Sequence, residues 1–141
     1  MKINYQRLFI SIIIPLVLGG LVAILTVPNS GIESKLPGWV FMVVWSIIYV
    51  LMGVSCYLIY QDTLEIPKVY ITNLIFNYLW CFIFFRLKWF VFAFIWIIIL
   101  FFITLKMIKE FKTVNKLAGN LQIPYTLWLI VAAILNLMYI I

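Results

Sequence analysis

The sequence is poor in the residues from which most catalytic and metal sites are built. Its 141 residues include no histidine and two cysteines, Cys56 and Cys81, which lie in different apolar stretches. The four acids lie in polar segments or at the end of an apolar stretch: Glu33, Asp62, Glu65 and Glu110. A metal site, a Cys–His nucleophile and a pair of catalytic carboxylates therefore lack their components. Proton-coupled transport is disfavoured as well, because it normally needs an ionisable group inside the bilayer.

Apolar residues dominate what remains. Hydrophobic residues make up 67% of the chain, charged residues make up 10%, and the mean hydropathy is +1.22. Apolar stretches of about 20 residues recur, and each is long enough to cross about 30 Å of hydrocarbon as a helix. We therefore expect an all-α integral membrane protein, a five-transmembrane-helix bundle that forms one domain over residues 1–141. The expected spans are about 8–27, 38–60, 69–85, 89–107 and 117–141, the last running through Pro124 as an in-helix proline.

Lysine and arginine are divided unequally between the two predicted ends of the bundle. The N-terminal segment and the second and fourth loops hold seven: Lys2, Arg7, Lys68, Lys106, Lys109, Lys112 and Lys116. The first and third loops hold three: Lys35, Arg86 and Lys88. Because cytoplasmic loops carry the excess of positive charge, we expect a cytoplasmic N-terminus and, after five spans, a C-terminus outside. This rule accounts for the net charge of +6. The charge therefore indicates contact with membrane lipid and not a nucleic-acid partner.

Amides and aromatic residues recur at helical spacing in three of the spans. The three sets are Asn73, Asn77 and Trp80; Phe41, Trp45, Tyr49 and Cys56; and Tyr125, Trp128, Ala132 and Asn136. Such a stripe faces either a neighbouring helix or a cavity between helices. In the first case the amides make interhelical hydrogen bonds and the tryptophans form a belt at the membrane interface. In the second case the same residues line a ligand pocket.

The depth of three tryptophans favours a pocket. From the expected spans, Trp45, Trp80 and Trp128 come within about one helical turn of the same level, roughly 10–16 Å from the edges of the hydrocarbon. A belt residue lies at the edge, where we expect Trp39 and Trp89. The three deeper tryptophans are therefore not expected to belong to the belt.

Four stretches of the sequence resemble one family of membrane proteins. They are PLVLGGLVAILT, PGWVFMVVWSIIYVLMGVSCYLIY, NLIFNYLWCFIFF and LQIPYTLWLIVAAILN, and with them the likeness runs in order over all five spans. They combine P-x-x-x-F-x-x-x-W-x-x-x-Y, N-x-x-W-x-x-x-F and P-Y-x-x-W followed by A-x-x-L-N. This combination resembles the TspO/MBR family, the tryptophan-rich sensory proteins related to the mitochondrial translocator protein (peripheral-type benzodiazepine receptor).

The resemblance implies a five-helix bundle, often a homodimer, with a pocket closed by the first loop that binds porphyrins, haem or synthetic ligands. No cofactor is required, and the expected ligand is a porphyrin-type tetrapyrrole such as protoporphyrin IX or haem, whose ring faces stack on indoles. Asn136 is expected to make an interhelical hydrogen bond near the outer end instead. Together with the stripes, the resemblance gives these ligand-binding residues: Trp45, Tyr49, Asn77, Trp80, Tyr125, Trp128 and Ala132.

Three functions stay open at this point. The first is a tetrapyrrole-binding sensor, carrier or regulator, which we expect, in a bacterial cell membrane. The second is a light- and oxygen-dependent enzyme that degrades protoporphyrin IX, with Trp45 and Trp128 as candidate catalytic residues. The third is a membrane interaction partner with a vestigial pocket. The first loop is shorter than is usual in the family and has Leu36 where the family has a proline, so closure of the pocket by this loop stays open too.

The charge distribution predicts opposite sides of the membrane for Lys112 and Ser34. Lys112→Cys and Ser34→Cys, each in a chain freed of Cys56 and Cys81, should be compared in intact cells with an impermeant thiol reagent. We expect position 34 to react from outside and position 112 to react only after the membrane is permeabilised. Labelling of position 112 from outside intact cells would overturn the topology.

Overall fold

The structure, a computed structural model, describes residues 2–33 and 35–141, so the labelling site at Ser34 lies outside the described residues. It consists of α1 (Tyr5–Thr26), α2 (Gly38–Thr63), α3 (Lys68–Cys81), the π-helix η1 (Phe82–Arg86), α4 (Phe90–Val114), α5 (Lys116–Asn120) and α6 (Ile123–Met138). Five helical segments are long and apolar enough to cross a membrane, with α3 and η1 forming one and α5 and α6 another. The prediction of an all-α bundle with five spans is confirmed.

The fourth span is longer than the sequence suggested. The expected span ended at residue 107 and was followed by a basic loop, but α4 continues to Val114. Phe111 explains the difference, because it is 1% exposed and extends the buried face of α4 one turn beyond Met107. Lys106, Lys109 and Lys112 lie on the exposed side of the same helix. The chain leaves the helix at Asn115, whose side chain accepts hydrogen bonds from the first amides of α5.

The last span is also different, because it is not one continuous helix over 117–141. It breaks between α5 and α6, and Pro124 lies in the first turn of α6, where its missing N–H costs little. Gln122 fixes the break to α2 by donating from Nε2 to the carbonyl of Leu51 (3.2 Å) and to Ser55 Oγ (2.6 Å). Pro124 is therefore a helix-start residue and not the in-helix proline that the sequence suggested.

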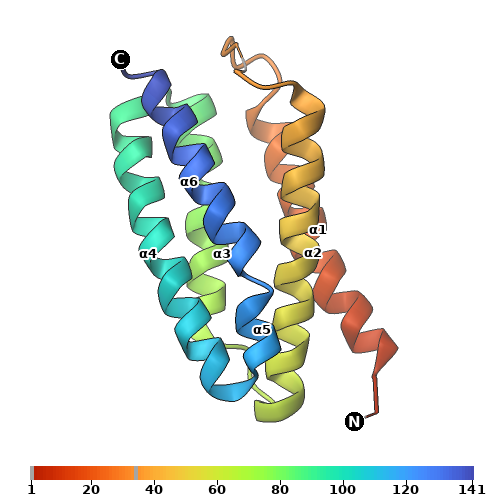
Figure 1. The fold of residues 1–141 in the computed structure, drawn as a ribbon. Coiled ribbons are helices and arrows are strands. Elements are labelled where there is room, and N and C mark those ends of the chain that lie inside the picture. The colour runs from red at the N-terminus through yellow and green to blue at the C-terminus, as the bar shows by residue number, and fades with distance from the viewer. Residues whose placement is uncertain (1, 34) are drawn as a thin grey trace.

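The helices form two groups that contact each other mainly through α2 with α5 and α4 and through α1 with α3. Figure 1 shows α1 beside α2 and α4 beside α3 and α6. The first loop, residues 27–37, lies at the same end of the bundle as the C-terminus, and the N-terminus lies at the opposite end (Figure 1). We refer to these two ends as the C-terminal end and the N-terminal end.

The contact between α1 and α2 depends on two glycines. A Cβ at Gly53 would lie 2.3 Å from the carbonyl oxygen of Ser11, which Pro15 cannot bond because it has no N–H. A Cβ at Gly19 would lie 2.4 Å from the ring of Tyr49. These glycines therefore allow the close backbone approach expected of small residues in a membrane helix pair, and Gly19 leaves room for the Tyr49 ring.

Candidate ligand cavity

A cavity of about 350 Å³ lies inside the C-terminal end of the bundle. Its wall is mainly apolar and comes from α1, the first loop, α2, α3, η1 and α6. Its volume is near the lower limit of the range of about 300–1,000 Å³ for small-molecule sites. Gly20 has nothing within 4 Å of the position a Cβ would take, and it lines the cavity, so this part of α1 faces open space.

Aromatic rings from α2 and α6 form one wall. Trp45 stacks on Tyr49 with ring centroids 5.6 Å apart and planes 26° apart. Trp128 of α6 meets Trp45 edge to face at 6.3 Å and 89°, and it meets Phe41 at 5.8 Å and 75°. The wall therefore presents two indoles and a phenol ring, fixed relative to one another by ring contacts.

Below this wall a chain of buried hydrogen bonds crosses the bundle. Tyr49 Oη donates to Asn77 Oδ1 (2.6 Å), and Asn77 Nδ2 donates to Tyr125 Oη (2.7 Å). Tyr125 Oη donates to Asn73 Oδ1 (2.8 Å), and Asn73 Nδ2 donates to Thr104 Oγ1 (2.9 Å). Thr104 ends the chain by donating to a backbone carbonyl of its own helix. We call these five residues the buried chain; each is at most 6% exposed, and together they link α2, α3, α6 and α4.

The comparison with known proteins identifies the family. The model of the TspO/MBR family matches residues 11–141, which include every cavity and buried-chain residue described above. This chain belongs to the TspO/MBR family. A search of the curated proteins gave no match. Membership of the TspO/MBR family and the five apolar spans make the chain an integral, multi-pass membrane protein.

Five of the seven residues expected to bind ligand in this TspO/MBR protein line the cavity: Trp45, Tyr49, Trp80, Trp128 and Ala132. The other two, Asn77 and Tyr125, lie beneath it in the buried chain, where their polar atoms bond to each other and to neighbours. Helical spacing could not separate the two groups, because both lie on inward faces. Asn77 reaches the cavity wall through its hydrogen bond with Tyr49, and Tyr125 reaches it through its ring, which meets Trp45 edge to face at 6.3 Å.

Asn136 lies at the upper edge of the cavity of this TspO/MBR protein and makes the interhelical contacts expected from the sequence. Its Oδ1 accepts from Trp80 Nε1 (3.2 Å), and its Nδ2 donates to the carbonyl of Phe90 (2.9 Å). The residue is 1% exposed. Asn136 therefore ties α6 to α3 and to the start of α4, and it holds the ring of Trp80 in place.

The π-helix supplies two cavity residues that are not among the seven expected from the sequence. Phe84 and Phe85 line the cavity together with Trp80 and Cys81, each one helical turn further along the chain. Phe84 stacks on Trp80 at 4.9 Å and 22°, and Phe85 meets Phe84 edge to face at 4.9 Å. Phe84 ends the motif N-x-x-W-x-x-x-F, but neither the motif nor the four-residue spacing from Trp80 indicates that Phe84 and Phe85 face a cavity. Single-turn π-helices are often found at functional sites.

The first loop contributes to the mouth of the cavity. Ile32 and Lys35 are lining residues, and Tyr139, just after α6, holds the loop by donating from its hydroxyl to the carbonyl of Glu33. Burial raises the pKa of Tyr139 above its ordinary value. Arg86 donates from Nε to the carbonyl of Leu25 (2.8 Å) in the last turn of α1, just before the loop. The shortened loop of this TspO/MBR protein thus still reaches the cavity.

One buried donor in the cavity wall has no partner. Trp128 is 9% exposed, and its Nε1 has no hydrogen-bond partner among the described residues. A buried N–H group without a partner costs about 1–3 kcal/mol relative to a bonded one. An acceptor atom on a bound molecule within reach of this indole would remove that cost.

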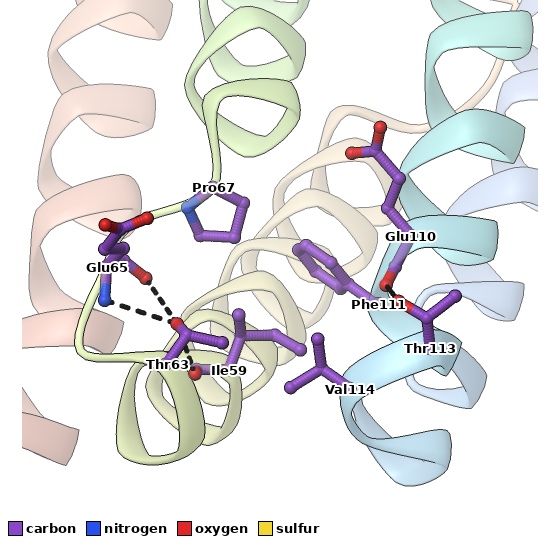
Figure 2. A pocket seen from close by; sticks show the side chains of 8 residues that line it. All are labelled: Ile59, Thr63, Glu65, Pro67, Glu110, Phe111, Thr113 and Val114. Atoms are coloured by element: carbon purple, nitrogen blue, oxygen red, sulfur yellow. Dashed lines mark hydrogen bonds between the residues drawn. The ribbon is translucent and has the colours of Figure 1, made fainter.

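A second hollow, at the N-terminal end, has different chemistry. It has a volume of about 260 Å³ and lies between the end of α2, the α2–α3 loop and the end of α4. Figure 2 shows Glu65 and Glu110 on opposite sides of it, and shows Thr63 and Thr113 bonded to the backbone of their own segments. Phe111 is the single aromatic residue among its lining residues. This hollow therefore lacks the paired rings that make the C-terminal cavity suited to a flat aromatic ligand.

The buried chain predicts a stability cost for removing a single oxygen. Tyr125→Phe leaves Asn77 Nδ2 without an acceptor and Asn73 Oδ1 without its donor from Tyr125, so we expect a loss of about 1–2 kcal/mol in the free energy of unfolding. Thermal unfolding in detergent should show a lower Tm. Tyr5→Phe is the matched control, because Tyr5 is 74% exposed. Equal Tm values for Tyr125→Phe and Tyr5→Phe would mean that the buried chain does not stabilise the fold.

Proposed function

We propose that this TspO/MBR protein binds a porphyrin-type tetrapyrrole, such as protoporphyrin IX or haem, and acts as a sensor, carrier or regulator of tetrapyrrole levels. The observation that carries the proposal is the aromatic wall in which Trp45 stacks on Tyr49 and meets Trp128 at 89°. Stacked and edge-to-face rings of this kind accept the face of a flat macrocycle. The volume, the apolar lining and the few polar groups are those of a small-molecule site.

The position of the cavity supports binding from one end of the bundle. The buried chain closes the bundle below Tyr49, whereas the lining continues upward through Ile32 and Lys35 of the first loop. A flat ligand therefore enters with its apolar body against the indoles and its polar edge toward the mouth. With the N-terminus in the cytoplasm, as the loop charges favour, this mouth lies on the outer side of the membrane.

The proposal predicts that two tryptophans respond to ligand and two do not. Protoporphyrin IX added to the purified protein in detergent should quench tryptophan fluorescence at micromolar concentration. Trp45→Phe and Trp128→Phe should each weaken binding by about 0.5–1.5 kcal/mol. Each replaces an indole that stacks on the ligand, and this is the usual worth of an aromatic pair in addition to the burial of apolar area. Trp39→Phe and Trp89→Phe are the controls, since these residues are 67% and 56% exposed.

The outcomes separate the three functions. Absence of porphyrin binding to the wild-type protein would contradict the proposal and favour a membrane interaction partner with a vestigial pocket. Equal weakening by all four substitutions would mean general destabilisation, and the pocket would be withdrawn.

A second candidate function is light- and oxygen-dependent degradation of protoporphyrin IX. It is favoured by one observation, namely that Trp45 and Trp128 lie 6.3 Å apart in the wall of one cavity. An excited porphyrin held there has two indoles beside it that can exchange electrons with it or react with singlet oxygen. Porphyrin loss under light but not in the dark, reduced in the Trp45→Phe and Trp128→Phe variants at saturating ligand, would promote the enzyme above the sensor.

A further inference from the structure

The polar groups in the cavity wall are mostly used within the protein. The hydroxyl of Tyr49 donates to Asn77, and the side chain of Asn136 bonds to Trp80 and to a backbone carbonyl. Ser46 donates to a carbonyl of its own helix at 2.7 Å. These groups therefore hold the protein together and leave little hydrogen-bonding capacity for a ligand. Two nitrogen donors in the wall differ from them.

The first of these donors, at the mouth, is the ammonium of Lys35. Lys35 lines the cavity, and its Nζ lies 5.4 Å from the centroid of the Tyr139 ring. Its Nζ has no hydrogen bond or ion pair with any residue in 2–33 or 35–141. Glu33 is the single acid in the loops of the C-terminal end; its backbone carbonyl accepts from the Tyr139 hydroxyl, and its charge acts on the same tyrosine. Among the described residues the Lys35 ammonium thus stands at the rim of an apolar cavity without an ion-pair partner.

The other two cations in the loops of the C-terminal end are placed differently. Arg86 donates to the carbonyl of Leu25 at the end of α1. The ammonium of Lys88 lies 3.6 Å from the position that a Cβ would take at Gly31, which places it against the first loop. Lys35 is therefore the one cation of the described residues that lines the cavity.

The second donor is deeper in the cavity. Trp128 Nε1 is buried and without a partner among the described residues, and its ring is part of the aromatic wall. The cavity thus offers rings for an apolar body, a neutral N–H in the wall and a positive charge at the rim. These features match a ligand that is amphipathic along its length.

We propose that the ligand carries an acidic group at the edge that faces the mouth, and that Lys35 is the residue that recognises this acid. The inference rests on the proposed tetrapyrrole site and specifies how the ligand is oriented in it. A carboxylate beside Lys35 forms a charge-assisted hydrogen bond, which is about twice as strong as a neutral one. The bond forms at the edge of an apolar region, where screening by water is weaker than at an open surface.

An anionic oxygen at this place has two possible sources, the ligand's own carboxylate or the phosphate of a membrane lipid. The position of Lys35 favours the ligand, because the residue is part of the cavity wall and its neighbour Tyr139 lines the cavity as well. A single bound molecule can then satisfy the indole in the wall and the ammonium at the rim. A lipid phosphate would occupy the rim alone.

The test compares a diacid with its neutral ester. Protoporphyrin IX and its dimethyl ester have the same ring, so they differ in charge at one edge only. We expect Lys35→Gln to weaken binding of the diacid by about fivefold to tenfold and to leave binding of the ester unchanged within about twofold. Lys35→Arg should restore binding of the diacid, since it keeps the charge. Lys88→Gln is the matched control, because it removes a charge at the same end outside the cavity.

Each other result decides against the inference. If Lys35→Gln weakens binding of the diacid and of the ester equally, Lys35 positions the loop and does not recognise the acid. If Lys35→Gln leaves the affinity for the diacid unchanged, Lys35 has no role in binding. An equal effect of Lys88→Gln would indicate long-range attraction at the whole C-terminal end. In these cases the tetrapyrrole site itself stands. Failure of the wild-type protein to bind either compound would remove the proposed function together with the inference.

The lipid source is tested with the same protein with and without a phospholipid. Binding of the diacid to the wild-type protein should be measured in dodecyl maltoside micelles, which contain no phosphate, and in the same micelles with phosphatidylglycerol added. We expect the effect of Lys35→Gln to be the same in both. If phosphatidylglycerol weakens diacid binding to the wild-type protein and not to Lys35→Gln, the lipid phosphate occupies the rim, and the ligand's acid is not what Lys35 recognises.

Discussion

The buried chain from Tyr49 to Thr104 is the constraint on which the rest of the structure depends. Its hydrogen bonds run in one direction, and they join four helices at a depth where water cannot replace a lost partner. Its first member has two roles, because the hydroxyl of Tyr49 begins the chain while its ring forms the base of the aromatic wall. The helices that carry Trp45 and Trp128 are thereby held in register. The hydrogen bonds of the buried chain thus fix the position of the cavity walls above them.

The two ends of the bundle are built for different tasks. Toward the N-terminal end the helices are held together by polar side chains. Gln122, between α5 and α6, donates hydrogen bonds to the carbonyl of Leu51 and the hydroxyl of Ser55 in α2. Toward the C-terminal end, small residues such as Gly20 and Ala132 leave space, and the π-helix carries Phe84 into the opposite wall. Packing residues and cavity residues thus follow one another on the same helices. The match to the TspO/MBR family model includes both ends of the bundle.

The sequence predicts the five spans and the inward stripes because hydropathy and helical spacing are local properties. It does not predict where α4 ends, since Phe111 is buried by neighbours far away in the chain. Spacing alone also places Asn77 and Tyr125 on an inward face without saying whether that face meets a cavity or another side chain. Lys35 lies in a loop with no periodicity, so its place at the rim follows only from the fold.

The central claim, that a tetrapyrrole binds in this cavity, is tested most directly by narrowing the cavity at one residue. Ala132 lines it and is 5% exposed, whereas Ala133 packs against the core and is not a lining residue. Thr is β-branched and can bond the preceding helical turn at either position, so helix effects are matched. The dissociation constant of protoporphyrin IX should rise about tenfold in Ala132→Thr from overpacking and stay within about twofold in Ala133→Thr. Wild-type affinity in Ala132→Thr, with both variants folded, would contradict the account.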